Sequence, residues 1–419
     1  NSLPAPVNQP FLEQANHPDI VEELSAFNVE INAPPGQLKG DIFSRTHDVL
    51  SQIWTICENS SQTLNTRPAM IGILPTVRDE MLQPGWMSDT KRYRALNEQL
   101  MLHRKNELLH IDISGHDHLD YRCDHIMLEA ACTSLQAHLK INQEDGVRFY
   151  NAGVLAAAPL VAATANSPFL YGKSLWCETR IPAFEQSTAV KGFRDISGRN
   201  VTRVTLGTGY LRHSFLELFL ENLSFPPLLP SLEDERERLP HLRLQNGTIW
   251  RWIRPILGFD GDGAPHIRIE HRVMPAGPTI PDTVANLALC HGLMLMLARQ
   301  KEPPEAYTSF AAARENFYAC ARFGLDADVA WENHTINVQQ LLLDQLIPAA
   351  RAALIEEDVN KDDVAYYIDE IIVSRVRSGR TGAAWQRSFI ECNSQNFQAM
   401  TDQYLELQDT QAPVHTWKI

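Results

Sequence analysis

Four segments of the sequence combine carboxylates, arginines, a Gln-x-His pair and tryptophans at alternate positions. These segments are residues 27–32, 134–141, 248–255 and 266–273. Carboxylate oxygens are preferred ligands of Mg²⁺, and a protein-bound Mg²⁺ usually also holds substrate phosphates. Arginine presents a planar fork that fits a carboxylate or a phosphate. The residue types together favour a site that handles several negatively charged oxygens at once.

The same alternation predicts strands with one polar face, because neighbouring side chains of a strand point to opposite sides. The polar faces are predicted to carry Asn28, Glu30 and Asn32; Ser134, Gln136, His138 and Lys140; Thr248, Trp250, Trp252 and Arg254; and His266, Arg268, Glu270 and Arg272. An ordinary solvated face of an antiparallel sheet is the alternative interpretation. Solvated faces are usually rich in Lys, Glu, Thr and Ser, so the composition here favours a functional face.

Several segments resemble glutamate–cysteine ligase family 2, the carboxylate–amine ligases. They run in the order of the family through nearly the whole chain: Asn28-Val-Glu-Ile-Asn, Glu129-Ala-Ala-Cys-Thr-Ser-Leu-Gln-Ala-His, Ala165-Asn-Ser-Pro-Phe, Thr248-Ile-Trp…Arg-Pro, Arg268-Ile-Glu-His-Arg, Glu315-Asn316, Arg322-Phe-Gly324 and Gly379-Arg-Thr-Gly-Ala-Ala-Trp-Gln386. Any one segment is weak evidence, but this many in sequence are fairly specific.

The resemblance implies an α+β fold, in which an antiparallel sheet curls into a funnel flanked by helices, similar to the catalytic fold of glutamine synthetases. It also implies ATP and Mg²⁺ as cofactors. Members phosphorylate the γ-carboxylate of glutamate, and an amine such as cysteine then displaces the phosphate to form an amide. Divalent ions and arginines suit this chemistry because it brings several anionic oxygens together.

The resemblance also assigns roles to individual residues. Glu30, His138 and Glu270 match metal-binding positions, and Gln136, Thr248 and Trp250 match positions that face the nucleotide or substrate. Arg272 and Arg254 are the candidate catalytic residues. Arg272 is expected beside the metal, where the phosphoryl group passes, and Arg254, farther from any carboxylate, is expected to hold glutamate. Glu270 is expected to be either a metal ligand, whose loss the fold tolerates, or one partner of a surface ion pair.

One family feature has no counterpart in the sequence. The family has a Gly-x-Glu-x-Glu strand near its start that supplies further metal carboxylates, and no such segment lies upstream of Pro4. We expect that this strand precedes Asn1 in the full protein. A non-catalytic relative that lacks metal ligands is the alternative.

Other motifs give weaker signals. Gly172-Lys-Ser resembles the end of a phosphate-binding P-loop, but Ser167 stands where the first glycine belongs. Within the resemblance, Lys173 and Arg180 are still expected to face the nucleotide. No zinc spacing fits the group His116, His118, Cys123 and His125. Residues 260–263 are expected to form a turn between two strands, and Cys132 is expected to be a buried thiol.

Composition indicates the class of protein. The net charge of −14 argues against general affinity for nucleic acid or anionic membranes. Seven cysteines without a CxxC pair indicate free thiols in a reducing compartment, so we expect a cytoplasmic protein. The longest apolar run, residues 152–165, is interrupted by Pro159 and is predicted to be a buried helix. Small molecules are the expected partners, and a homo-oligomer is compatible with the sequence.

The chain is predicted to contain a catalytic α+β unit over residues 1–302 and a helical C-terminal part over residues 303–419, packed against it. A helix capped by Asp282 or Thr283 is expected to run to about Arg299, before Pro303-Pro304. Further helices are expected at about 311–323, 337–356 and 363–378. Three functions stay open: a ligase for cysteine, a ligase for another amine, and a non-catalytic sensor or scaffold that binds glutamate or nucleotide.

Overall fold

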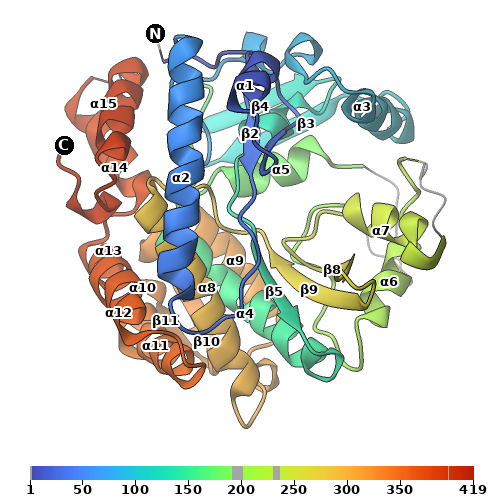
Figure 1. Cartoon of the computed structure of the whole chain (residues 1–419), viewed down its shortest axis with the longest axis vertical. Helices are drawn as coiled ribbons and strands as arrows, with labels where there is room; N and C mark the ends of the chain where they lie inside the picture. Colours follow the sequence, from blue (N-terminus) through green and yellow to red (C-terminus); the bar gives the residue numbers. More distant parts are fainter. Residues whose placement is uncertain (1, 191–201, 230–235, 395) are drawn as a thin grey trace.

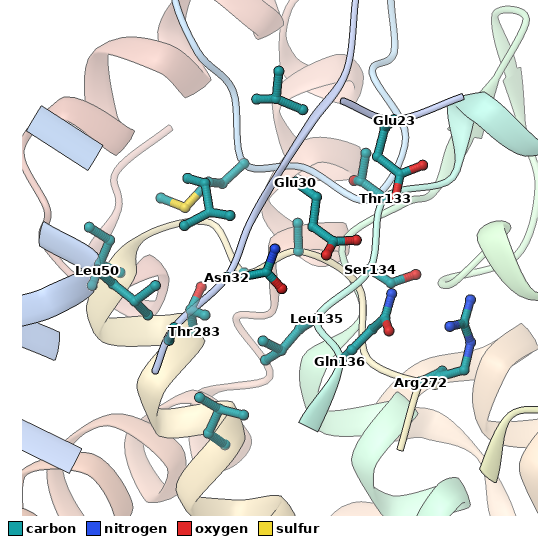
Figure 2. Close-up of a pocket in the computed structure, with 18 of the residues that line it drawn as sticks. Glu23, Glu30, Asn32, Leu50, Thr133, Ser134, Leu135, Gln136, Arg272 and Thr283 are labelled. Atoms are coloured by element: carbon teal, nitrogen blue, oxygen red, sulfur yellow. The ribbon is translucent and has the colours of Figure 1, made fainter. Parts of the chain in front are cut away.

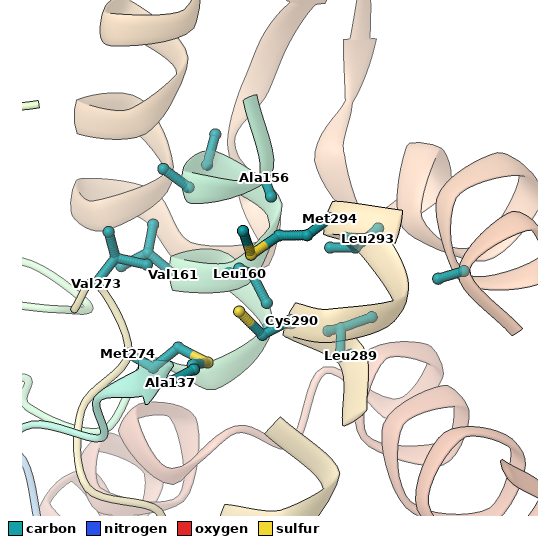
Figure 3. Packing of buried hydrophobic residues seen from close by; sticks show 14 of the residues in the cluster. Ala137, Ala156, Leu160, Val161, Val273, Met274, Leu289, Cys290, Leu293 and Met294 are labelled. Carbon is teal, nitrogen blue, oxygen red and sulfur yellow. The ribbon is translucent and has the colours of Figure 1, made fainter. Parts of the chain in front are cut away.

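Two apolar helices form the centre of the molecule. The computed structural model describes residues 2–190, 202–229, 236–394 and 396–419, and in it α4 (Gly146–Thr164) packs on α8 (Ile280–Arg299) (Figure 1). Figure 3 shows Leu160 of α4 close to Cys290 and Met294 of α8, whereas Val161 lies beside Val273. The predicted buried helix at 152–165 is confirmed, with Pro159 inside α4.

The N-terminus of α8 differs in detail from the sequence-based expectation. Thr279, and not Asp282 or Thr283, is the N-cap, and its side chain accepts a hydrogen bond from the Asp282 amide. The carboxylate of Asp282 instead binds Arg375 of α13 (Val373–Ser378) at 2.7 Å. This buried ion pair ties the central helix to the C-terminal helices.

A three-stranded antiparallel sheet lies beside these helices, in the order β5 (Ala137–Ile141), β9 (Pro265–His271), β8 (Ile253–Phe259). Its register places His138 opposite Glu270, and Glu270 opposite Arg254. The three side chains therefore form one row across the sheet. Residues 260–263 form the turn between β8 and β9, as predicted.

The four segments with polar faces do not form one sheet. Among the described residues, β2 (Val29–Ile31) pairs only with β1 (Ile20–Glu22). The predicted strand over residues 248–255 is wrong in its first half, because α7 (Pro240–Gly247) ends just before Thr248 and β8 begins at Ile253. The alternating tryptophans lie in the connection, where Trp252 is fully buried against Phe184 and Phe317.

A second core surrounds a separate hairpin, β3 (Leu109–Ser114) and β4 (His118–Cys123). Near it lie α3 (Lys91–His103) and α5 (Arg180–Ser187), and a further antiparallel pair is formed by β6 (Phe169–Leu170) and β7 (Lys173–Ser174). The N-terminal part adds α1 (Asn8–Ala15) and the long α2 (Ile42–Thr63), which packs on α8. A short helix, α6 (Leu216–Asn222), precedes α7.

The C-terminal part is mainly helical, and the three helical stretches expected there are confirmed. The first is α9 (Phe310–Phe323), the second contains α10 (Val338–Leu341) and α11 (Ile347–Glu356), and the third contains α12 (Lys361–Val364) and α13, with π-helical turns at Leu342–Leu346 and Ala365–Ile372. The helices α14 (Gly382–Cys392) and α15 (Phe397–Asp409) and the hairpin of β10 (Asp328–Trp331) and β11 (His334–Asn337) were not predicted. α9 contacts α4, and α11 contacts α8 so closely that a Cβ on Gly292 would lie 3.0 Å from Ala350. One hydrophobic core therefore spans both predicted parts.

By length and composition alone, α4, together with the turn before it, and α8 could each cross a bilayer. Most of each apolar stretch is buried inside the fold, which is the position of core helices. All seven cysteines are free thiols, as expected.

Candidate active site

A cavity of about 2490 Å³ lies between β2, β5, α2 and α8. Figure 2 shows Glu30, Gln136 and Arg272 around its polar part, with Leu50 of α2 on the opposite side. Among the described residues, β2 pairs only with β1, and β5 pairs only with β9. Two unpaired strand edges therefore border the cavity.

The polar wall of the cavity is organised around Glu270, whose side chain is buried. One carboxylate oxygen, Oε1, accepts hydrogen bonds from Arg254 Nε at 2.8 Å and from Arg272 Nη1 at 2.9 Å. The other oxygen, Oε2, lies 3.4 Å from His138 Nε2. Burial alone would raise the pKa of Glu270, but the two guanidiniums and His138 hold this pKa well below its ordinary value. The carboxylate is therefore ionised at neutral pH.

This environment corrects two expectations. Glu270 does not form a surface ion pair, because only 4% of its side chain is exposed. Arg254 is not remote from carboxylates, because it binds Glu270 directly and also donates to the carbonyls of Gly247 and Ile249. The alternation pattern could not show this, because the contact depends on the register between β8 and β9.

Two further carboxylates, Glu23 and Glu129, line the same cavity beside Glu30. Glu23 follows β1, and Glu129 lies in the short 3₁₀-helix Met127–Ala131. Burial, followed by repulsion from Glu129 and Glu30, raises the pKa of Glu23 to about 8. Burial raises the pKa of Glu129 to about 7, although the charge of Arg272 opposes the shift. These carboxylates lack enough positive charge around them to stay ionised at neutral pH.

The sequence prediction missed both residues. Glu129 stands alone in the apolar run 126–131, which was a usable signal for a buried carboxylate. Glu23 follows Glu22, and such a pair of acids is typical of a solvated surface. Only the folding of β1 beside the 3₁₀-helix places Glu23 next to Glu129.

Five of the predicted site residues line the cavity: Glu30, Gln136, His138, Glu270 and Arg272. Five others do not: Thr248, Trp250, Arg254, Lys173 and Arg180. Lys173 is exposed on β7. Arg180 is fully buried, where it donates to Glu178 Oε1 at 3.1 Å and to Ser134 Oγ at 2.9 Å. Its guanidinium also donates to the carbonyls of Arg272 and Val273, so it holds the backbone next to the cavity in place.

The cavity contains side chains that could serve as ligands of a metal ion. Within the described parts of the chain, no three His, Cys, Asp or Glu side chains are arranged ready to hold one. Glu23, Glu30 and Glu129 nevertheless provide the oxygen donors that suit Mg²⁺. The raised pKa values of Glu23 and Glu129 reflect a deficit of positive charge, so the chemistry of this donor set fits a divalent cation. Away from the cavity, His118 pairs with Asp112 and His125 lies near Gln83.

Comparison with known proteins identifies the family of the chain. The family model for glutamate-cysteine ligase family 2 (GCS2) matches residues 7–408. The chain belongs to this family. It is accordingly a member of a ligase family whose reactions join a carboxylate to an amine. No curated protein matches the chain at a significant level. The family match includes both the row around Glu270 and the carboxylates at Glu23 and Glu129.

We predict that Glu270→Gln destabilises the fold. The change leaves two buried guanidiniums, those of Arg254 and Arg272, without a counter-charge, and breaking a buried ion pair typically costs about 3–5 kcal/mol. The melting temperature should fall by about 3–6 °C. Glu80→Gln is the matched control, because its pair with Arg78 is exposed at 3.7 Å. Equal melting temperatures for both variants and the wild type would contradict the prediction.

We also predict that the contribution of Glu23 to stability in the metal-free protein is lost as pH rises from about 5 to about 8. An unfolded glutamate ionises near pH 4.3, whereas Glu23 keeps its proton up to a pKa of about 8 in the folded state. At this residue the folded state binds more protons in this window, so raising the pH weakens its contribution to stability.

Melting temperatures measured in the presence of a chelator test this pH dependence. Glu23→Gln should flatten the slope, because the glutamine cannot ionise. Glu22→Gln should keep the slope of the wild type, because Glu22 accepts a hydrogen bond from Gln9 at the surface. An unchanged slope in Glu23→Gln would be evidence against a protonated Glu23.

Proposed function

We propose that the protein is an ATP-dependent ligase that activates the γ-carboxylate of glutamate and joins it to an amine such as cysteine. The observation that carries the proposal is the charge arrangement in the cavity. The buried carboxylate of Glu270 binds two guanidiniums, and one of them, that of Arg272, also acts on Glu129, whose pKa burial raises to about 7. Such a site favours anionic oxygens together with divalent cations.

The proposed reaction has two steps. A γ-carboxylate oxygen of glutamate attacks the γ-phosphorus of ATP, the bond from phosphorus to the bridging oxygen breaks, and ADP leaves with that bond's electron pair. The amine nitrogen then attacks the acyl carbon, the bond from carbon to the phosphoryl oxygen breaks, and inorganic phosphate leaves. The nitrogen loses a proton as the amide forms. A bound Mg²⁺ would neutralise charge on the phosphates during the transfer.

The residues of this chain would have different roles in the reaction, according to their positions in the cavity. Arg272 faces the cavity and would orient the anionic oxygens of the substrates. Arg254 lies behind Glu270 and would fix its carboxylate, and through it Arg272. Glu30, with Glu23 and Glu129, would hold one divalent cation, and His138 with Glu270 would contribute a second set of ligands. Gln136 would contact nucleotide or glutamate; the placement of Thr248, Trp250, Lys173 and Arg180 supports no direct role.

We further propose that the sheet belongs to a funnel fold. The free edges of β2 and β5 border the same cavity, where a curled sheet like that of glutamine synthetases would continue. ATP, glutamate and an amine are the proposed small-molecule substrates. The free thiols are consistent with a cytoplasmic protein.

The test is to incubate the full-length protein with ATP, Mg²⁺ and glutamate, and to measure ADP across a panel of amines. ADP release that requires both glutamate and one amine would support the proposal and identify the acceptor. ADP release without glutamate would contradict it. Binding of glutamate or ATP without any ADP release would favour a non-catalytic sensor.

We predict that Arg272→Lys lowers kcat by about a hundredfold, because lysine keeps the charge but loses the fork that fits anionic oxygens. Arg299→Lys is the control, since Arg299 lines the same cavity but pairs with the partly exposed Glu357. Its kcat should stay within about twofold of the wild type. Similar kcat values for the two variants would remove Arg272 from the reaction.

A further inference from the structure

The guanidinium of Arg272 is held by few hydrogen bonds. Among the described residues, it donates one hydrogen bond, from Nη1 to Glu270 Oε1 at 2.9 Å, and its buried Nε has no partner. The guanidinium of Arg254 instead binds both oxygens of Glu270 and the carbonyls of Gly247 and Ile249. Hydrogen bonds therefore fix the direction of Arg254, whereas a single hydrogen bond leaves Arg272 free to turn.

The ring of Phe184 supplies a second contact to Arg272. The Cζ atom of Arg272 lies over this ring, 5.9 Å from its centroid, which is within the range of a cation–π contact. Phe184 belongs to α5, is buried and lines the cavity. Because the ring attracts the charge of the guanidinium without accepting from its N–H groups in the plane, the remaining donors stay available for anionic oxygens.

Phe184 is itself fixed by its neighbours. The edge of one ring meets the face of the other where Trp252 packs on Phe184, with centroids 5.6 Å apart and planes at 74°. Trp252 Nε1 donates to Glu185 at 2.7 Å, and Arg180 lies over the Trp252 ring at 5.3 Å. The amide of Arg272 donates to the Trp252 carbonyl, and Arg180 donates to the Arg272 carbonyl. One cluster, formed by Arg180, Trp252 and Phe184, therefore holds both the backbone and the side chain of Arg272.

We infer that Phe184 is a positioning residue, whose ring keeps the guanidinium of Arg272 directed at the anionic oxygens of the substrates. The inference rests on the role proposed for Arg272 in ligation. A phosphoryl group in transfer spreads its charge over three oxygens, and donors stabilise this charge best when they already point toward it. Without the ring, the hydrogen bond to Glu270 would not stop the guanidinium from turning, so turnover would fall.

The first experiment measures ADP release by the wild type, Phe184→Leu and Phe317→Leu. Leucine keeps an apolar side chain but removes the ring. Phe317 is the matched control, because it is buried and packs on the same Trp252 at 6.1 Å, but does not line the cavity. We expect kcat to fall about tenfold in Phe184→Leu, through loss of a desolvated cation–π contact, and to stay within about twofold in Phe317→Leu. Equal kcat values for the two variants would overturn the inference.

A double-mutant cycle separates positioning from a general disturbance of the fold. Arg272→Gln leaves no charge over the ring of Phe184. When Phe184→Leu is added to Arg272→Gln, kcat should fall by less than about twofold, because the group that the ring positions is already absent. A further loss of about tenfold in this background would show that Phe184 acts independently of Arg272, and would overturn the inference.

The last experiment needs neither turnover nor a variant of Phe184. In NMR spectra of the wild type, with the side-chain signals of Arg272 assigned by their loss in Arg272→Gln, we expect nuclear Overhauser contacts between Arg272 and the ring protons of a phenylalanine. Their absence would overturn the inference. A wild type that releases no ADP would overturn the proposed ligase, while this measurement would still decide whether the ring of Phe184 holds Arg272.

Discussion

The site depends on the buried carboxylate of Glu270 and the two guanidiniums that bind it. Arg254 on β8 and Arg272 after β9 both bind the same oxygen, at 2.8 and 2.9 Å. A buried charge without a partner is costly, so strand registers that separate these groups are strongly disfavoured. The pairing of Glu270 with Arg254 therefore helps to fix β8 against β9, and the position of Arg272 at the cavity follows from it.

The opposite side of the cavity has too little positive charge for its carboxylates. Glu23 has a pKa of about 8, because burial and repulsion from Glu129 and Glu30 both raise it. Glu129 has a pKa of about 7, because burial outweighs the charge of Arg272. The buried carboxylates lower the stability of the fold here, as is common at functional sites. A divalent cation would remove the repulsion, and its charge would also draw phosphate oxygens toward Arg272. The two sides together form a site with separate places for cations and anions.

The periodicity of the sequence predicted the elements better than their arrangement. Alternation correctly predicted β5 and β9 as strands and put His138 and Glu270 each on a polar face, because burial of one face imposes a period of two on a strand. The row that these two residues share depends on the register between the strands, which alternation does not give. The same rule failed at Trp250 and Trp252, where aromatic packing in a connection imitates a strand. Glu129 and Glu23 were missed, because their proximity arises from contacts between segments about a hundred residues apart, which no local pattern records.

Transfer of oxygen from glutamate to phosphate tests the central claim most directly, namely that the charges in the cavity activate a carboxylate. Glutamate labelled with ¹⁸O in its γ-carboxylate is incubated with ATP, Mg²⁺ and the accepted amine, and the inorganic phosphate is analysed by mass spectrometry. The account predicts one labelled oxygen in each phosphate released, because the bond between carbon and the phosphoryl oxygen breaks in the second step. Unlabelled phosphate released together with ADP would show that water, and not glutamate, attacks ATP, and would contradict the account.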